Sequence, residues 1–240
     1  MRVHPMIYGI GVLKVGEVTN GHASTRWLLL TTPLSRFEIQ VVGRDAVKSL
    51  LEKHHYTHSV GKVTIAYGLF DGGTLVGAIT YGQVSSRDLA QSIFEGGNQH
   101  NCFEFLRMVV LDDVTCSRSW FIARTIKLLR KSHPHIRMLV SFADQTEGHW
   151  GYVYQASNWL YTGTTNKKYH YLRGEKRVNK RVVWDAAQKI SMPEKDFAAQ
   201  NGYIKIEELP KFRYIYPLDK HAILKLISMS YPKKGVECNG

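Results

Sequence analysis

The stretch SFADQTEGHWGYVYQASNWLYTG, residues 141–163, decides the fold. Its first residues complete an apolar run, MLVSFA, which predicts a buried strand that ends at the carboxylate of Asp144. We expect a short aromatic helix next, and then a second strand over WLYTGTT, residues 159–165. Because strands of open α/β sheets carry functional groups at their carboxyl ends, Asp144 is a candidate site residue.

The rest of the chain predicts a mixed β-sheet flanked by helices, and therefore an α/β fold. Apolar periodicity and turn residues indicate a strand over 36–42, a helix over 44–53, a hairpin over 63–82, a central strand over 103–113 and an amphipathic helix over 117–132. Ser117 is the expected N-cap of the last helix. Phe121, Ile122, Ile126, Leu128 and Leu129 should form its inward face.

Composition changes near residue 172. We assign residues 1–172 to one catalytic domain, whose first 43 residues are β-rich and include a strand-like run over 26–32. Residues 173–240 are interpreted as a basic C-terminal extension that packs on this domain, with a short helix over 219–229. The length of 240 residues suits one domain with such an appendage.

Hydrophobic residues make up 44% of the chain, which is enough for a sizeable core. No apolar run approaches the roughly 20 residues of a membrane helix, and the N-terminus lacks the pattern of a signal peptide. The three cysteines, Cys102, Cys116 and Cys238, are unclustered. They predict free thiols in a reducing cytoplasm.

The formal net charge of +12 favours a polyanionic partner. Basic residues concentrate in RGEKRVNKR, residues 173–181, with aromatic residues Tyr169, Tyr171 and Trp184 nearby. Cations interleaved with aromatic rings are typical of nucleic-acid surfaces. The candidate DNA-binding residues are Arg173, Lys176, Arg177, Lys180 and Arg181.

Arg107 and the loop over residues 54–59 are two further candidate sites for catalysis or binding. Arg107 lies in the central apolar strand, where a charge must be paired or used. The loop HHYTHS, residues 54–59, offers His55 and Tyr56. A polar loop with one packed histidine is an alternative interpretation. With Asp144 as third donor, His55 and Tyr56 would suit iron rather than structural zinc.

The segment from Tyr154 to Trp159 resembles the Tyr-x-x-x-Gly-Phe spacing of GNAT acyltransferases, with Asn158 in place of glycine. Asparagine is the next-best residue at a left-handed helix C-cap. In that superfamily the phenol at the position of Tyr154 acts as general acid toward the leaving thiolate. Ser119 opens the helix whose N-terminus would receive the coenzyme A pyrophosphate, although DVTCSRS (113–119) replaces the usual glycine-rich turn.

Five blocks in the same order resemble the Mom family of phage DNA-modification proteins. The likeness covers roughly residues 44–185. The blocks are HYTHS from His55, TLVGAITYG (74–82), FEFLRMVV (103–110), SRSWFIARTIKLL (117–129) and SFADQTEGHWGYVYQASNWLYTG (141–163).

The resemblance implies a GNAT-like fold and an enzyme that adds a carbamoylmethyl group to N6 of adenine in double-stranded phage DNA. This modification shields the DNA from restriction enzymes. The functional positions implied are His55, Tyr56, Arg107, Ser119, Asp144 and Tyr154. The resemblance also implies acetyl-coenzyme A or a related donor, and iron. We expect a host-cell cytoplasmic location and no membrane partner, and a homodimer stays open.

Two other functions stay open at this point. An ordinary GNAT acetyltransferase would act on a small amine or a protein lysine. A non-catalytic DNA-binding protein of the anti-restriction type would explain the charge but not the carboxylate, arginine and tyrosine expected in one cleft.

Overall fold

The computed structural model describes residues 12–13, 28–29, 34–114 and 116–234. Contacts divide the chain into two compact units. The first unit comprises Met1–Ser141, Ala156–Asn158 and Tyr216–Leu226, and the second comprises Phe142–Gln155, Trp159–Ile215 and Ile227–Gly240. The expected domain boundary at residue 172 stays a prediction, because units defined by contacts need not fold independently.

The main sheet has seven strands in the order β3-β4-β5-β6-β7-β12-β8. Neighbouring strands from β3 to β6 pair antiparallel, whereas β6 and β7 are parallel. The mixed α/β sheet expected from the sequence is therefore confirmed. The strands are β3 (Phe37–Val42), β4 (Ile65–Asp71), β5 (Thr74–Gln83), β6 (Cys102–Val110), β7 (Met138–Ala143), β8 (Leu160–Thr164) and β12 (Phe212–Pro217).

Three helices of the first unit belong to this fold: α1 (Arg44–His54), α2 (Arg87–Ile93) and α3 (Arg118–Ser132), and a 3-10 turn, η1 (Leu34–Arg36), precedes β3. Ser117 caps α3 as expected, because its side chain accepts a hydrogen bond from the backbone N–H of Trp120. Four of the five residues expected on the inward face of α3 are buried, but Leu128 is 37% exposed.

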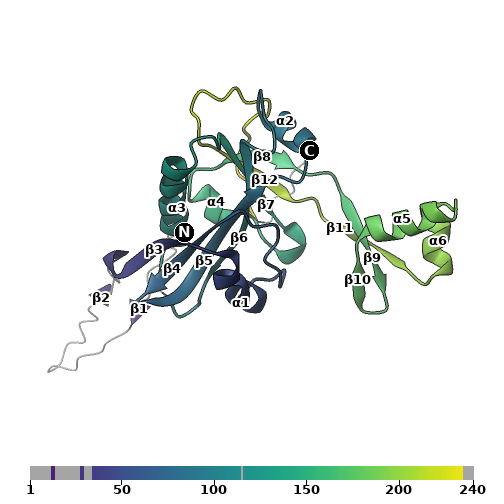
Figure 1. The fold of residues 1–240 in the computed structure, drawn as a ribbon, viewed down its shortest axis with the longest axis horizontal. Coiled ribbons are helices and arrows are strands. Elements are labelled where there is room, and N and C mark those ends of the chain that lie inside the picture. The colour runs from purple at the N-terminus through teal and green to yellow at the C-terminus, as the bar shows by residue number, and fades with distance from the viewer. Residues whose placement is uncertain (1–11, 14–27, 30–33, 115, 235–240) are drawn as a thin grey trace, which may run out of the picture. The chain divides into compact units, whose positions relative to one another are not determined.

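Helices α1 and α3 cover opposite faces of the first unit's strands (Figure 1). Val47 and Leu51 of α1 share a buried cluster with Ala78 of β5. Tyr81 lies three residues after Ala78 in the same strand, and its hydroxyl lies 2.8 Å from the hydroxyl of Thr125 in α3. Because successive strand residues alternate between faces, Ala78 and Tyr81 point to opposite sides of the sheet.

The second unit contains a separate three-stranded sheet in the order β10-β9-β11. Helices α5 and α6 pack on one face of it around buried Tyr171, Val183 and Ala198. Besides β8 and most of β12, the elements of this unit are η2 (Gln145–Glu147), α4 (Tyr152–Gln155), β9 (Lys168–Arg173), β10 (Lys176–Val178), α5 (Lys180–Lys189), α6 (Glu194–Gln200) and β11 (Ile204–Glu208). The basic run 173–181 therefore forms part of an ordered hairpin and helix.

The prediction of a helix over residues 219–229 is wrong, because this segment contains no helix. The segment begins with an Asx turn, in which the N–H of His221 donates to the carboxylate of Asp219. Lys225 N–H then donates to the Ile93 carbonyl, and Leu224 forms an isolated bridge with Phe94. These external partners take the backbone groups that a helix would pair internally.

The prediction of free thiols is confirmed for Cys102 and Cys116, which are both buried. Cys238 lies outside the described residues, as does most of the strand-like run over 26–32. Two short strands, β1 (Val12–Leu13) and β2 (Leu28–Leu29), pair antiparallel. Among the described residues, none of the helices has the length and apolar character needed to cross a membrane.

Candidate functional site

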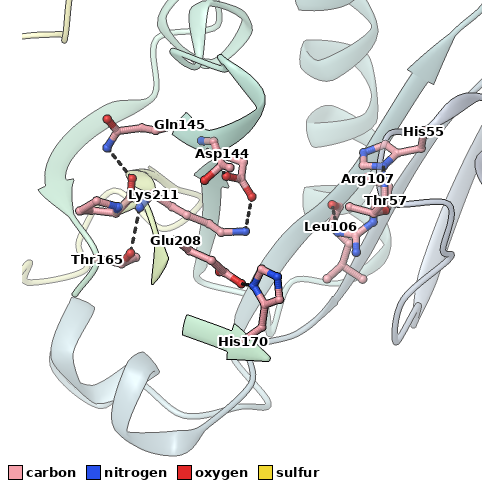
Figure 2. A network of polar contacts seen from close by, with 12 residues as sticks. His55, Thr57, Leu106, Arg107, Asp144, Gln145, Thr165, His170, Glu208 and Lys211 are labelled. Carbon is pink, nitrogen blue, oxygen red and sulfur yellow. Dashed lines mark hydrogen bonds and ion pairs between the residues drawn. The ribbon is translucent and has the colours of Figure 1, made fainter. Parts of the chain in front are cut away.

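Asp144 follows β7 directly and caps the short turn η2. One carboxylate oxygen accepts a hydrogen bond from the backbone N–H of Thr146 at 3.1 Å. The other lies 2.5 Å from the ammonium of Lys211 (Figure 2). The side chain of Asp144 is only 13% exposed and that of Lys211 is 30% exposed. Asp144 is thus a largely buried, paired carboxylate at a strand end.

The surroundings of Asp144 act on its pKa in opposite directions. Burial by itself raises the pKa, whereas the hydrogen bond and charge of Lys211 and the N–H of Thr146 lower it, and the net pKa lies below the ordinary value. The carboxylate is therefore ionised at neutral pH and is a weak proton acceptor. This favours a fixed negative charge over the role of general base.

Lys211 is the partner that sequence reasoning missed. It stands between β11 and β12, next to Pro210, in a stretch without a motif. Its backbone N–H donates to the Thr165 hydroxyl at 3.0 Å, and its carbonyl accepts from the Thr165 N–H at 2.9 Å. The Gln145 amide also donates to the Pro210 carbonyl. The loop that carries Lys211 is therefore fixed by the backbone of Lys211 itself and by the carbonyl of Pro210.

Tyr154 lies in α4, and the end of this helix confirms the predicted role of Asn158. Asn158 has a φ of +58°, the left-handed conformation expected of it. The N–H of Trp159 donates to the carbonyl of Tyr154 at 3.0 Å, which closes a Schellman-type turn. The Tyr154 ring packs at centroid distances of 5.2 Å from Trp159 and 5.3 Å from Tyr214. Tyr154 is thus held among aromatic rings.

Tyr214 anchors the start of the same segment. Its hydroxyl donates to the Trp150 carbonyl at 2.6 Å and accepts from the Gln155 amide at 3.0 Å. Burial is the main reason that the pKa of Tyr214 is raised far above its usual range, so the phenol stays protonated. Gly151 has a φ of +74° and lies against this ring. The position of Tyr154 therefore depends on a glycine and a buried tyrosine.

His55 and Tyr56 lie in the first unit, just after α1. His55 is buried, and its Nδ1 lies 2.8 Å from the Thr57 hydroxyl and accepts from the Thr57 N–H at 3.2 Å. The Tyr56 ring lies 4.5 Å from the His55 ring and is 38% exposed. The loop thus presents an accessible phenol beside a fixed imidazole.

Arg107 joins the same loop. Its guanidinium donates to the Ser59 carbonyl at 3.3 Å and to the Leu106 carbonyl at 2.7 Å (Figure 2 labels Arg107 and Leu106). The structure therefore brings Arg107 of β6 to the end of the His55–Ser59 loop, although these residues are 48 positions apart. Neither contact supplies a carboxylate to this cation.

Ser119 occupies the first turn of α3. Its hydroxyl lies 2.9 Å from that of the N-cap residue Ser117. One of these hydroxyls donates to the other, so a single O–H remains to donate to an anion, together with backbone N–H groups at this end of the helix. This arrangement is compatible with the expected phosphate contact, which stays a prediction. The convergence of Arg107 and Ser119 with Asp144 and Tyr154 in one cleft stays a prediction too.

The five candidate DNA-binding cations are all exposed. Lys176 and Arg177 are neighbours in strand β10 and so point to opposite faces of its sheet, which means that the five do not share one face. Arg177 pairs with Glu208 at 2.5 Å, and Arg181 pairs with Asp185 at 2.9 Å while stacking on Trp184. Arg173 lies over the Tyr203 ring and Lys180 over the Tyr169 ring. Lys176 stands opposite Arg173 on the hairpin. Several of these charges are therefore already balanced within the unit.

The aromatic residues of this region are less accessible than a stacking surface requires. Tyr171 is buried, and its hydroxyl donates to the Glu194 carboxylate at 2.9 Å. The Tyr169 hydroxyl donates to the same carboxylate at 3.0 Å. Trp184 is 39% exposed. Of the three rings expected near the basic run, Trp184 is the best placed to meet a base.

We expect the phenol of Tyr171 to ionise only near pH 12. Burial, and then the hydrogen bond and charge of Glu194, raise the pKa of Tyr171 to about 12 from its ordinary 10.0. Because the folded pKa is the higher one, the protonated phenol stabilises the fold fully below pH 10, and this contribution is lost as the pH rises toward 12. NMR of ring-labelled tyrosine should show a lower midpoint in Glu194→Gln but not in the exposed Glu175→Gln. Equal midpoints in all three proteins would contradict the assignment.

The expected metal donors are His55, Tyr56 and Asp144. Within residues 12–13, 28–29, 34–114 and 116–234, no group of three or more His, Cys, Asp or Glu side chains is arranged to hold a metal ion. The Asp144 carboxylate instead holds Lys211.

The chain is 25% identical over 213 residues to "Methylcarbamoylase mom" of Escherichia phage Mu, covering 82% of this chain and 88% of that protein. Among solved structures, an N-acetyltransferase of Staphylococcus aureus aligns with a TM-score of 0.42 at 11% identity, over 76% of this chain and 97% of that one.

A GNAT family N-acetyltransferase of Escherichia coli in complex with CoA aligns with a TM-score of 0.38 at 13% identity, over 54% of this chain and 71% of that one. At such low identities and scores, these likenesses say nothing about donor or substrate. The family model described as the Mom protein family matches residues 36–233. This match spans most of the sequence, and the chain therefore belongs to the Mom protein family.

Proposed function

We propose that this protein is a DNA-modifying transferase that adds a carbamoylmethyl (methylcarbamoyl) group to N6 of adenine in phage DNA and so protects it from restriction. The observation that carries the proposal is the likeness to "Methylcarbamoylase mom" over 88% of that protein. The net charge of +12 supports a polyanionic substrate. Since N6 of a stacked, paired adenine is poorly accessible, the base would be flipped out of the duplex.

The residues have the following roles in this proposal. Asp144, as an ionised and oriented carboxylate, would hold the amine or the positive charge that develops on it. Tyr154 would place its phenol at the reacting group. Arg107 and Ser119 would bind the phosphates of acetyl-coenzyme A or a related donor, using a guanidinium and the first turn of α3. Tyr56, exposed beside His55, would stack on the flipped base.

Iron is the less supported of the two expected cofactors. It would require His55, Tyr56 and Asp144, but the carboxylate of Asp144 is engaged by Lys211. The Nδ1 atom of His55 already has Thr57 as its partner. These contacts do not fit a preformed iron centre, and no step of the proposed reaction is assigned to one.

Nucleoside mass spectrometry tests the proposal. Plasmid DNA from bacteria that express the wild-type chain should contain an adenine nucleoside heavier by one carbamoylmethyl group. Asp144→Ala should reduce its amount by about 100-fold or more, as expected when an oriented charged group at a reacting centre is removed. Glu147→Ala, an exposed carboxylate three residues further along, is the matched control and should modify DNA like the wild type.

Other outcomes separate the alternatives. Unmodified DNA together with an acetylated small amine or lysine would identify an ordinary acetyltransferase. Unmodified DNA with tight duplex binding and no acetylated product would indicate a non-catalytic DNA-binding protein. Modification at wild-type level by Asp144→Ala would remove Asp144 from the site.

A further inference from the structure

Helix α3 is the most basic element of the first unit. Its 15 residues include Arg118, Arg124, Lys127, Arg130 and Lys131 and no acidic residue. Its buried side is apolar apart from Thr125, and these cations stand on the solvent side. The sequence pattern marked α3 only as an amphipathic helix, and the proposed chemistry uses only its N-terminus.

Three of these cations border a groove between α3 and the segment that contains η1 and β3. The groove has a volume of about 630 Å³. Its apolar lining comes from Leu34, Phe37, Ile39, Trp120 and Leu128, and its basic lining from Arg124, Lys127 and Lys131. Apolar walls of this kind support the aliphatic stems of long cationic side chains and leave the charged ends at the rim.

The spacing of the three cations is regular. Arg124, Lys127 and Lys131 are separated by three and four residues, so they lie along one face of the helix. At 1.5 Å per residue, this row extends for about 10 Å. A row of cations of this length can follow neighbouring phosphates along one strand of a DNA duplex.

The charges in this row are not balanced internally. Among the described residues, none of the three forms an ion pair with a carboxylate, and Arg124 instead lies 5.7 Å from the centroid of the Trp120 ring. By contrast, Arg177 and Arg181 of the basic run are paired with Glu208 and Asp185. Within the described part of the chain, all three cations of the groove are therefore without a carboxylate partner, whereas two of the five cations of the basic run are held by one.

We propose that this groove binds the sugar-phosphate backbone of the substrate DNA, through Arg124, Lys127 and Lys131. The inference rests on the proposed function for the identity of the substrate. The contacts are to phosphates, so they position the duplex and do not select a sequence. The chain's own first 33 residues are a poor occupant, because they carry Arg2, Lys14 and Arg26 against the single acid Glu17.

The test measures binding of the full-length protein to a fluorescein-labelled 30-base-pair duplex over a series of salt concentrations. Each phosphate contact contributes about 0.9 to the slope of log K against log salt. The triple variant Arg124→Gln, Lys127→Gln, Lys131→Gln should therefore lower the slope by about 2 to 3. Its affinity near physiological salt should fall by roughly 10- to 100-fold.

A matched control removes the same net charge from scattered exposed positions. The variant Lys48→Gln, Lys195→Gln, Lys225→Gln should change the slope by less than about 1, because only the long-range field is reduced. An equal fall of the slope in this control, or an unchanged slope in the groove variant, would overturn the proposal. The charge-retaining variant Arg124→Lys, Lys127→Arg, Lys131→Arg should keep the wild-type slope, and its failure to do so would also overturn it.

Two further readouts separate the possible failures. If the groove held a nucleotide donor instead, calorimetry would show that the Gln variant loses affinity for coenzyme A while its duplex slope is unchanged, and this result overturns the proposal. The wild type could fail to modify adenine while the groove variant still showed a lower slope of log K against log salt. In that case the groove would still bind DNA, and the proposed reaction would be wrong.

Discussion

Gly151→Ala should destabilise the protein by about 3 kcal/mol, the sum of backbone strain and overpacking. Gly151 has a φ of +74°, where a Cβ atom is strained. That Cβ would also lie 2.4 Å from Cε2 and 2.6 Å from Cζ of Tyr214. The Tyr214 ring is fully buried, and its hydroxyl is fixed by Trp150 and Gln155, so it cannot move aside without breaking these hydrogen bonds.

Gly148→Ala is the matched control. Gly148 has a similar φ of +69°, but a Cβ there would meet nothing within 4 Å. This variant should lose only about 1 kcal/mol of stability, from the backbone strain that a Cβ causes at this φ. Thermal unfolding should give a melting temperature lower by about 10 °C for Gly151→Ala and by about 3 °C for Gly148→Ala. Equal shifts would show that contact with Tyr214 contributes nothing.

The local features of the fold could be predicted from sequence because they depend on neighbouring residues. Asn158 adopts the left-handed conformation that its place after a short helix requires. Ser117 caps α3, and residues 63–82 form the expected hairpin across Gly72 and Gly73. Hydrophobic periodicity, helix-capping residues and turn residues each determine the conformation of the few residues around them.

The features that escaped prediction depend on residues far apart in the chain. Lys211 reaches Asp144 across 67 positions, and no spacing marks it as a partner. The helix expected over 219–229 is replaced by backbone bonds to Ile93 and Glu95, which are distant in sequence. The run 173–181 shows its charge in the sequence, but not that Glu208 pairs with Arg177. Tertiary partners therefore decide which charges are available for function.

Lys211→Met should cost about 2 kcal/mol of stability, because it leaves the Asp144 carboxylate without its cation. A fully buried pair would lose more, but Lys211 is 30% exposed, and water can replace part of the lost interaction. Asp144→Asn should cost less than about 1 kcal/mol. The amide oxygen can still accept from Thr146, and the freed ammonium can turn to solvent.

The double variant Lys211→Met, Asp144→Asn separates these causes. Once the carboxylate is neutral, the loss of Lys211 should add little. Urea unfolding of the wild type, the two single variants and the double variant should therefore give a coupling free energy of about 1.5 kcal/mol.

Lys205→Met is the control for an exposed pair, since the Lys205 ammonium lies 3.8 Å from Glu207 and both side chains are about half exposed or more. It should change stability by less than about 0.5 kcal/mol. Additive effects of Lys211→Met and Asp144→Asn would mean that Lys211 does not hold the carboxylate, and the fixed negative charge on which the proposed site depends would need another source.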